Sequence, residues 1–223
     1  MLKKIIVAID EIEILSFMNI VDHLDPNKCM VKIGSVSFNS IGNKAVEYVS
    51  EKGFEIFLDL KLHDIPNTVK KSIEGLRKMP IKMLTVHTSG GIVMMKSAMD
   101  AVMGSEIKII GVTALTSLND ENIKDIYKRN IKDQVNKMLD LAELAGIDGV
   151  VCSPHEIELV KRRYSLLSIT PGIRLNDLND DQNRIMTPSD AVELGADFLV
   201  IGRPITASKN IKKSLHEIFM SIQ

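Results

Sequence analysis

The sequence contains no tryptophan, and aromatic residues make up only 4% of its 223 residues. Proteins that bind single-stranded nucleic acid stack the bases on aromatic side chains, so this scarcity disfavours that class. The net charge is −1, whereas a general nucleic-acid binder normally carries a basic surface and a high isoelectric point. We therefore expect no nucleic-acid partner, and any anion that the protein binds must be bound locally.

Long apolar runs are also missing. No stretch approaches the roughly 18 apolar residues that a membrane-spanning helix needs, so we expect no membrane partner. The first residues, MLKKIIVAID, combine lysines with an apolar run that ends at Asp10, and no small-residue cleavage site follows. This pattern predicts a first strand rather than a signal peptide, with the mature protein beginning near Met1.

Cysteine is scarce as well. Cys29 and Cys152 lie in strand-like apolar runs, without the CxxC or Cys/His spacing of a metal site. We interpret them as buried thiols in a reducing compartment, which predicts a cytoplasmic protein. A disulfide or a metal site is the alternative for these two residues.

Short apolar segments rich in β-branched residues alternate with amphipathic segments of helical period along the chain. We predict strands at residues 5–9, 30–33, 55–60, 83–86, 107–112, 149–152, 167–170 and 198–201. We predict helices between them at residues 14–23, 38–52, 66–77, 93–103, 133–145, 154–163, 188–194 and 211–222. Eight strand–helix units predict a single-domain (β/α)8 TIM barrel over residues 1–223, with an open doubly wound sheet as the alternative.

Polar residues gather at the predicted carboxyl ends of the strands, which meet at one mouth of such a barrel. They are Asp10, Lys32, Asp59, Lys61, His87, Thr113, Thr170, Gly202 and Arg203. The opposite ends of the strands carry no comparable set. The sequence therefore predicts an active site at this mouth.

Residues 54–68, FEIFLDLKLHDIPNT, place charges inside an apolar strand. Asp59 and Lys61 are two residues apart, so an extended strand would point both side chains to the same face. A buried ion pair rarely stabilises a fold, because desolvation offsets the attraction between the charges, and we interpret this pair as functional. Lys32, Asp59, Lys61 and Asp64 alternate in sign, and we expect them to surround one small volume.

The residue types of this array limit its chemistry. Carboxylates beside a lysine favour its protonated form, which opposes a Schiff-base role and suits proton donation or stabilisation of a carbanion. The carboxylates could also collect Mg²⁺, but the lysines compete for the same oxygen atoms. We favour a metal-free site over a metal site, and consider a charge network without chemistry the least favoured interpretation.

Two glycine-containing turns follow the last two predicted strands, TPGIR at residues 170–174 and IGRPIT at residues 201–206. The loops after strands seven and eight are the usual phosphate site of such barrels, because glycine lets backbone N–H groups approach the anion. Arg203 can add a forked, charge-assisted contact. The phosphate-binding residues that we predict are Pro171, Gly172, Gly202 and Arg203. Residues 176–183, rich in Asn and Asp, are predicted to form a mobile loop that closes over the ligand.

These segments together resemble a known family. DLKLHDIPNT, the strand ends Asp10 and Lys32, VHTSGG at residues 86–91, TPGIR and IGRPIT closely resemble the orotidine 5′-phosphate decarboxylases, in the same order and over nearly the whole chain. The resemblance implies conversion of orotidine 5′-monophosphate to uridine 5′-monophosphate in pyrimidine biosynthesis. It further implies that no metal or organic cofactor takes part, and that a homodimer shares its active sites across the interface.

The resemblance also implies roles for the charged residues. Lys61 resembles the proton donor to pyrimidine C6, and Asp59 the carboxylate beside the departing CO₂. Lys32 is similar to the lysine that holds Asp59 and a ribose hydroxyl. Asp64 would enter the active site of the neighbouring subunit.

The remaining implied roles concern the ribose, the pyrimidine and the phosphate. Asp10 and, across the interface, Thr68 resemble ribose-hydroxyl contacts. Ser117, in TALTS after the fifth strand, resembles the pyrimidine-recognising serine. Gln182 resembles the residue that spans base and phosphate from the closing loop, and Arg203 resembles the phosphate clamp.

Two alternatives are retained. One is a 3-keto-L-gulonate 6-phosphate decarboxylase or hexulose-6-phosphate synthase, which shares the Asp-x-Lys-x-x-Asp spacing and works through Mg²⁺. The IPNT continuation after Asp64 and the serine of TALTS favour the pyrimidine enzyme over it. The other is a barrel that binds a phosphate ligand without catalysis.

Overall fold

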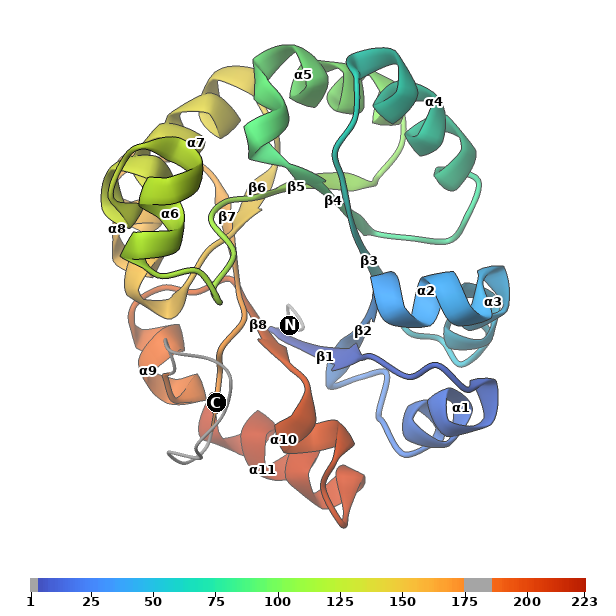
Figure 1. Ribbon diagram of the computed structural model, residues 1–223. Coiled ribbons are helices and arrows are strands. Elements are labelled where there is room, and N and C mark those ends of the chain that lie inside the picture. Colours follow the sequence, from blue (N-terminus) through green and yellow to red (C-terminus); the bar gives the residue numbers. More distant parts are fainter. Residues whose placement is uncertain (1–3, 175–185) are drawn as a thin grey trace.

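The computed structural model describes residues 4–174 and 186–223. Parallel strands close in chain order into a barrel, and the helices surround it (Figure 1). The strands are β1 (Ile5–Ile9), β2 (Cys29–Gly34), β3 (Ile56–Leu62), β4 (Met83–His87), β5 (Lys108–Val112), β6 (Gly149–Val151), β7 (Leu167–Thr170) and β8 (Phe198–Ile201). The predicted (β/α)8 barrel is thus confirmed, and β1 pairs with β8 instead of leaving an open sheet.

The α-helices are α1 (Ile14–Asp22), α2 (Ser35–Ile41), α3 (Asn43–Glu51), α4 (Pro66–Leu76), α5 (Gly91–Val102), α6 (Asp120–Tyr127), α7 (Ile131–Ala145), α8 (Ile157–Arg163), α9 (Pro188–Glu193), α10 (Arg203–Thr206) and α11 (Ile211–Ser221). Two short 3₁₀ helices are η1 (Thr88–Gly90) and η2 (Pro154–Glu156). Within the described ranges, none of these helices has both the length and the apolar character needed to cross a membrane.

The helices differ from the prediction in four places. The helix predicted at residues 154–163 begins as the 3₁₀ helix η2 and continues as α8. The predicted helix at residues 38–52 is two helices, α2 and α3, because Gly42 between them has φ 72° and ψ −148°, a conformation open to glycine. Helix α6 was not predicted, since its sequence is polar and only Ile123 is buried. Helix α10 was not predicted either, and it begins at Arg203 directly after β8.

Side chains alternate between two apolar layers. In β1, Ile6 and Ala8 face the barrel interior, while Ile5, Val7 and Ile9 pack against the helices. This is the period of two that a strand imposes. The interior layer consists of Ile6, Ala8, Met30, Phe57, Met83, Ile110, Ile169, Phe198 and Val200. It fills the barrel below the mouth, so the next inward-facing residues of each strand lie at the mouth itself.

Candidate active site

Lys32 and Asp59 are the inward-facing residues directly above this apolar filling. Each follows an interior residue by two positions, Met30 in β2 and Phe57 in β3, so strand geometry alone turns both side chains inward. Both are almost fully buried, with 8% of Lys32 and 7% of Asp59 exposed. Charges this buried require partners, and the structure supplies them.

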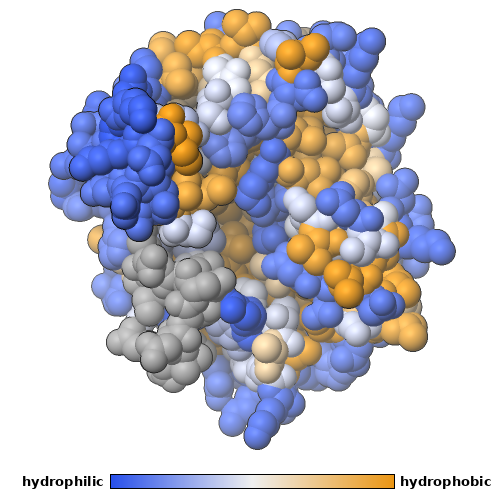
Figure 2. Space-filling view, in the orientation of Figure 1, coloured by the Kyte–Doolittle hydropathy of each residue, from blue (hydrophilic) through white to orange (hydrophobic). Residues whose placement is uncertain are grey.

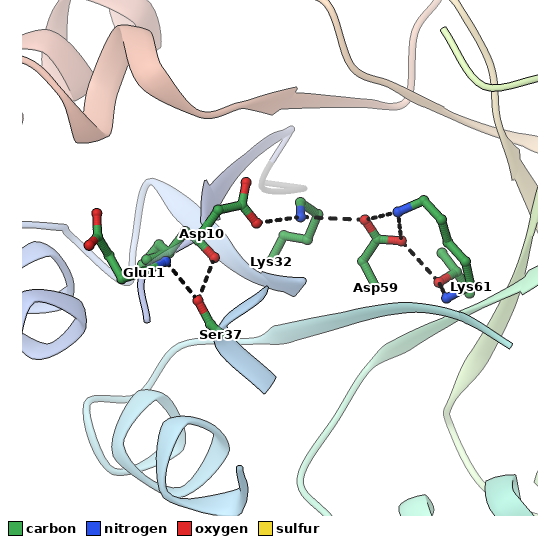
Figure 3. A network of polar contacts seen from close by, with 8 residues as sticks. Asp10, Glu11, Lys32, Ser37, Asp59 and Lys61 are labelled. Carbon is green, nitrogen blue, oxygen red and sulfur yellow. Dashed lines mark hydrogen bonds and ion pairs between the residues drawn. The ribbon is translucent and has the colours of Figure 1, made fainter. Parts of the chain in front are cut away.

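Four charged side chains form a continuous array across the mouth, shown in Figure 3. The Lys61 ammonium donates to both carboxylate oxygens of Asp59 at 2.9 Å. The Lys32 ammonium lies 3.4 Å from Asp59 Oδ2 and 3.6 Å from Asp10 Oδ1. The structure therefore brings together Asp10, Lys32, Asp59 and Lys61 in alternating sign. Three of these residues, Lys32, Asp59 and Lys61, belong to the alternating array predicted from the sequence, whose fourth member was Asp64.

Lys61 reaches Asp59 by a backbone irregularity rather than along an extended strand. Its φ is 51°, in the left-handed region, and the pairing of β3 with β4 shifts between Leu58 and Leu62. Such a conformation in a residue other than glycine is rare and strained, and it persists only where surrounding contacts hold it. The extended geometry predicted for this pair was therefore wrong, although both side chains reach the same place.

Thr85 of β4 supplies the contacts that hold this irregularity. Its buried hydroxyl accepts a hydrogen bond from the Lys61 backbone N–H at 2.8 Å and donates one to Asp59 Oδ1 at 3.0 Å. One side chain therefore orients both members of the ion pair. We did not predict Thr85 from the sequence, where the only signal was a polar residue within the apolar strand MLTVH.

The protonation state of Asp59 follows from opposing effects. Burial acts to raise its pKa, but the positive charges of Lys32 and Lys61 and the hydrogen bonds from Lys61 and Thr85 outweigh it. The net result holds the pKa of Asp59 below its ordinary value, so this carboxylate is anionic at neutral pH. Burial, together with the nearby charges of His63 and Lys61, lowers the pKa of His87 to about 4. His87 is therefore neutral at neutral pH.

Two adjoining cavities open beside the array. The larger, of about 620 Å³, is lined mainly by residues of the β1, β7 and β8 ends: Ala8, Asp10, Glu11, Lys32, Pro171, Gly172, Arg174, Val200, Gly202, Arg203, Thr206 and Ala207. The smaller, of about 160 Å³, is lined by Lys32, Phe57, Asp59, Lys61, Val112, Ala114, Leu115, Thr116, Val151, Pro171 and Val200. The two share Lys32, Pro171 and Val200. Arg174 and Arg203 line the larger cavity and mostly apolar side chains line the smaller one, so the two cavities together suit a ligand with an anionic end and a less polar body.

The four predicted phosphate-binding residues all line the larger cavity. Gly172 has φ 82°, a left-handed conformation that glycine adopts without strain. Arg203 is the first residue of α10, directly after Gly202. A second arginine, Arg174, lines the same cavity and is buried; its Nη1 donates to the carbonyl of Ile173 at 2.9 Å. Arg174 is the last residue of the TPGIR turn, and no role was predicted for it.

The carboxylates of the array are engaged by ammonium groups. Among the residues that the structure describes, no three or more His, Cys, Asp or Glu side chains are grouped so that they could hold a metal ion. The metal-free character of the site stays a prediction, to be tested in solution. Cys29 and Cys152 are both buried and do not form a disulfide with one another.

Comparison with known proteins places this geometry in a family. Residues 3–218 match the model of the Orotidine 5′-phosphate decarboxylase / HUMPS family. The chain belongs to this family. Two relatives, both named orotidine 5′-phosphate decarboxylase, are similar over almost their full length. The protein from Saccharophagus degradans is 42% identical, covering 96% of this chain and 93% of its own. That from Ehrlichia canis is 43% identical, covering 98% and 97%.

A solved structure within the same family is similar to this one. The crystal structure of orotidine 5′-phosphate decarboxylase from Lactobacillus acidophilus has a TM-score of 0.88 and 34% sequence identity, and the match covers 99% of each chain. The family membership that the motifs suggested is thereby confirmed for the whole barrel, including every strand that contributes to the array.

Two residues assigned from the family resemblance lie away from the array. Asp64 and Thr68 are exposed in the turn after β3 and at the start of α4, and Asp64 Oδ1 accepts a hydrogen bond from the Ile65 N–H at 2.6 Å. Asp64 therefore does not join the volume surrounded by Lys32, Asp59 and Lys61, contrary to our expectation from alternating charge. Asp64 lines neither of the two cavities, and its role in the site of another subunit stays a prediction.

Ser117 and Gln182 are the two residues expected to contact the pyrimidine. Ser117 is exposed and does not line either cavity, whereas its neighbours Leu115 and Thr116 line the smaller one. Gln182, with the whole of the predicted closing loop at residues 176–183, lies outside the described residues. Thr116 is thus the polar side chain that the β5–α6 loop brings to the smaller cavity.

Proposed function

We propose that this chain is an orotidine 5′-phosphate decarboxylase, acting within a single barrel domain over residues 1–223 in de novo pyrimidine biosynthesis. It converts orotidine 5′-monophosphate to uridine 5′-monophosphate and CO₂ without a metal or organic cofactor. The observation that carries the proposal is the Lys61 ammonium, held 2.9 Å from both oxygens of Asp59 at the edge of the smaller cavity. This proposal agrees with the family to which the chain belongs.

The larger cavity would take the ribose 5′-phosphate. Arg203 provides a guanidinium for the phosphate, and Pro171, Gly172 and Gly202 provide turns in which backbone groups can approach it. Asp10 and Lys32 line this cavity on the side of the array, where ribose hydroxyl groups would donate to Asp10 and accept from Lys32. Because the phosphate is remote from the bond that breaks, its binding energy serves to position the base.

The smaller cavity would take the pyrimidine. When the bond from C6 to the carboxylate breaks, CO₂ leaves and its electron pair stays on C6; the Lys61 ammonium then gives C6 a proton. A fixed ammonium stabilises the developing negative charge, since the ring offers no good electron sink. Asp59 holds that ammonium and, being anionic at neutral pH, repels the substrate carboxylate until CO₂ departs. Ser117 and Gln182 are proposed to contact the pyrimidine, Gln182 also reaching the phosphate.

A homodimer with shared active sites is the assembly we propose. Asp64 and Thr68 are exposed and line neither cavity, and Ile65 between them is 66% exposed. Apolar side chains are also exposed over α1 and α2, on the right of the view in Figure 2. An exposed apolar surface of this kind marks an interaction site. Asp64 would enter the partner's site, and Thr68 would contact its ribose. We also propose a cytoplasmic location, because buried thiols such as Cys29 and Cys152 are typical of proteins in a reducing compartment.

The direct test is the loss of orotidylate absorbance on adding purified protein to orotidine 5′-monophosphate. We expect turnover that is unchanged by EDTA, and abolished activity after chelation would refute the metal-free mechanism. Lys61→Ala should remove nearly all turnover while uridine 5′-monophosphate still binds measurably. Lys78→Ala, which removes an exposed lysine following α4, is the matched control and should be fully active. Nucleotide binding without any turnover by the unmutated protein would favour a silent binding barrel instead.

A further inference from the structure

Gly34, at the end of β2, has no conformational need to be glycine. Its φ is −87° and its ψ is 179°, an extended conformation open to every L-amino acid. It lies two residues after Lys32 and pairs in register with Asp59, so its α-carbon belongs to the inward-facing row of the barrel mouth. A side chain here would point into the site.

The space that such a side chain would need is filled by the charged array. A β-carbon built on Gly34 would lie 2.8 Å from Asp10 Oδ1 and 2.9 Å from Lys32 Nζ. These two atoms form an ion pair with each other at 3.6 Å, so the added methyl group would sit against both members. Glycine at this position therefore makes room for the Asp10–Lys32 pair.

Ser37, three residues further along, fixes the other side of Asp10. Its fully buried hydroxyl donates to the Ile9 carbonyl at 3.1 Å and accepts from the Glu11 N–H at 2.9 Å, as Figure 3 shows. Ile9 and Glu11 flank Asp10, so one hydroxyl holds the backbone on both sides of it. The turn from β2 into α2 thus determines where the Asp10 carboxylate points.

We propose that Gly34 and Ser37 are positioning residues for the Asp10–Lys32 half of the array. Gly34 acts by leaving space for the ion pair, and Ser37 acts by fixing the backbone that carries Asp10. Neither touches the substrate; both act through Asp10, and Gly34 also acts through Lys32. The inference rests on the proposed function, because it assigns these residues to the site that binds the ribose.

The position of the ion pair can be perturbed with little effect on the fold. The two atoms that a β-carbon at Gly34 would meet are the ends of side chains, which can move aside without displacing backbone. Ordinary contact begins at 3.4 Å, so each atom has to move by about half an ångström or more. Since a misplacement of about 1 Å can lower a rate about a hundredfold, Gly34→Ala should lower kcat/KM by about tenfold to a hundredfold.

The experiment compares two site variants with two controls. Gly34→Ala and Ser37→Ala are each expected to lower kcat/KM, and Gly34→Ala should unfold at nearly the same urea concentration as the unmutated protein. Gly75→Ala adds a methyl group to an exposed position of α4 with no neighbour within 4 Å. Ser168→Ala removes a buried hydroxyl that bonds Asp197 at the opposite end of the barrel. Both controls should keep full activity.

A double-mutant cycle separates positioning from general structural damage. In an Asp10→Ala background, Ser37→Ala should lower kcat/KM much less than in the unmutated protein, because the group that it positions is gone. Gly34→Ala should also lower kcat/KM less in that background, because only Lys32 is left to be displaced. If each substitution lowers kcat/KM by the same factor with and without Asp10, the proposal is overturned. Normal activity of Gly34→Ala would overturn it as well. If Ser37→Ala does not fold, Gly34→Ala decides the outcome. If the unmutated protein shows no turnover, the proposed function fails; if it is active and Gly34→Ala matches it, only this inference fails.

Discussion

Replacing Thr85 with valine would remove one buried hydroxyl while keeping the shape of the side chain. The hydroxyl accepts from the Lys61 N–H at 2.8 Å and donates to Asp59 Oδ1 at 3.0 Å. In the valine variant, the N–H of a residue held at φ 51° loses its hydrogen-bond acceptor, and the buried carboxylate loses one donor. Two groups of the catalytic pair are therefore released by one substitution.

The expected loss of stability follows from these two hydrogen bonds. A hydrogen bond to a charged group contributes about 1.5 to 3 kcal/mol, and a buried N–H left without an acceptor costs about 1 to 3 kcal/mol. Allowing for partial relaxation, we expect the free energy of unfolding to fall by about 2 to 4 kcal/mol. Because Lys61 is then free to leave its strained conformation, kcat should fall by about tenfold to a hundredfold. Loss of the Thr85 donor should also raise the pKa of Asp59, since that hydrogen bond helps to lower it.

The assay pairs urea unfolding at pH 7 with steady-state decarboxylation. Thr88→Val is the matched control, because Thr88 is equally buried but donates to a neutral acceptor, the Val112 carbonyl, at 2.8 Å. Thr88→Val should lower the free energy of unfolding by only about 1 kcal/mol and leave kcat nearly unchanged. Thr85→Ser retains the hydroxyl and should restore most of the activity. A kcat for Thr85→Val within twofold of the unmutated value, with a stability loss no larger than that of Thr88→Val, would refute the assigned role.

Further predictions concern the phosphate, the interface and pH. Arg203→Ala should raise KM by about tenfold or more with a smaller change in kcat, and an unchanged KM would count against a phosphate contact. Mixing Asp64→Ala and Lys61→Ala subunits should recover about a quarter of normal activity, since half of randomly formed dimers carry one intact site. No recovery despite verified mixed dimers would exclude shared sites. Because the pKa of Asp59 is lower in the folded protein than in the unfolded chain, ionised Asp59 stabilises the fold. This contribution to the free energy of unfolding is complete above about pH 4, and it is lost as the pH falls through the pKa of Asp59 in the folded protein. Asp59→Asn should therefore lose more unfolding free energy at pH 7 than at pH 3, and equal losses would contradict this.

The strands were predicted well because their signal is local. Each is a short apolar run rich in β-branched residues, and every observed bound lies within two residues of the prediction. The helices were harder where the signal was weak or contradictory. Residues 38–52 have a continuous helical period, and the break depends on the conformation of one glycine, Gly42. Helix α6 is capped by Asn119 and buries little, so its polar sequence resembled a loop.

The candidate site was predictable to the extent that strand geometry determines it. Lys32 and Asp59 are charged residues at inward positions, and the parallel barrel brings such positions to one mouth. Thr85, Gly34 and Ser37 were not predicted, because a threonine, a glycine and a serine near strand ends are common in any barrel. Their importance lies in contacts with residues distant in the sequence, namely Lys61, Asp10 and the Ile9 backbone, which no local pattern specifies.

The irregularity in β3 explains how one short stretch can serve two purposes. Leu58 pairs with Leu84 and Leu62 with Val86, so β3 advances four residues while β4 advances two. The extra residues accommodate Asp59 to Lys61, where the left-handed φ of Lys61 turns its ammonium back onto Asp59. With regular pairing, Lys61 would face the same way as Asp59 but one step higher in the mouth, and its N–H would not meet Thr85. Beyond the irregularity, the chain leaves the barrel and exposes Asp64. A change that regularised β3, such as loss of the Thr85 hydroxyl, should therefore disturb both the catalytic pair and the direction of the segment proposed to meet the partner.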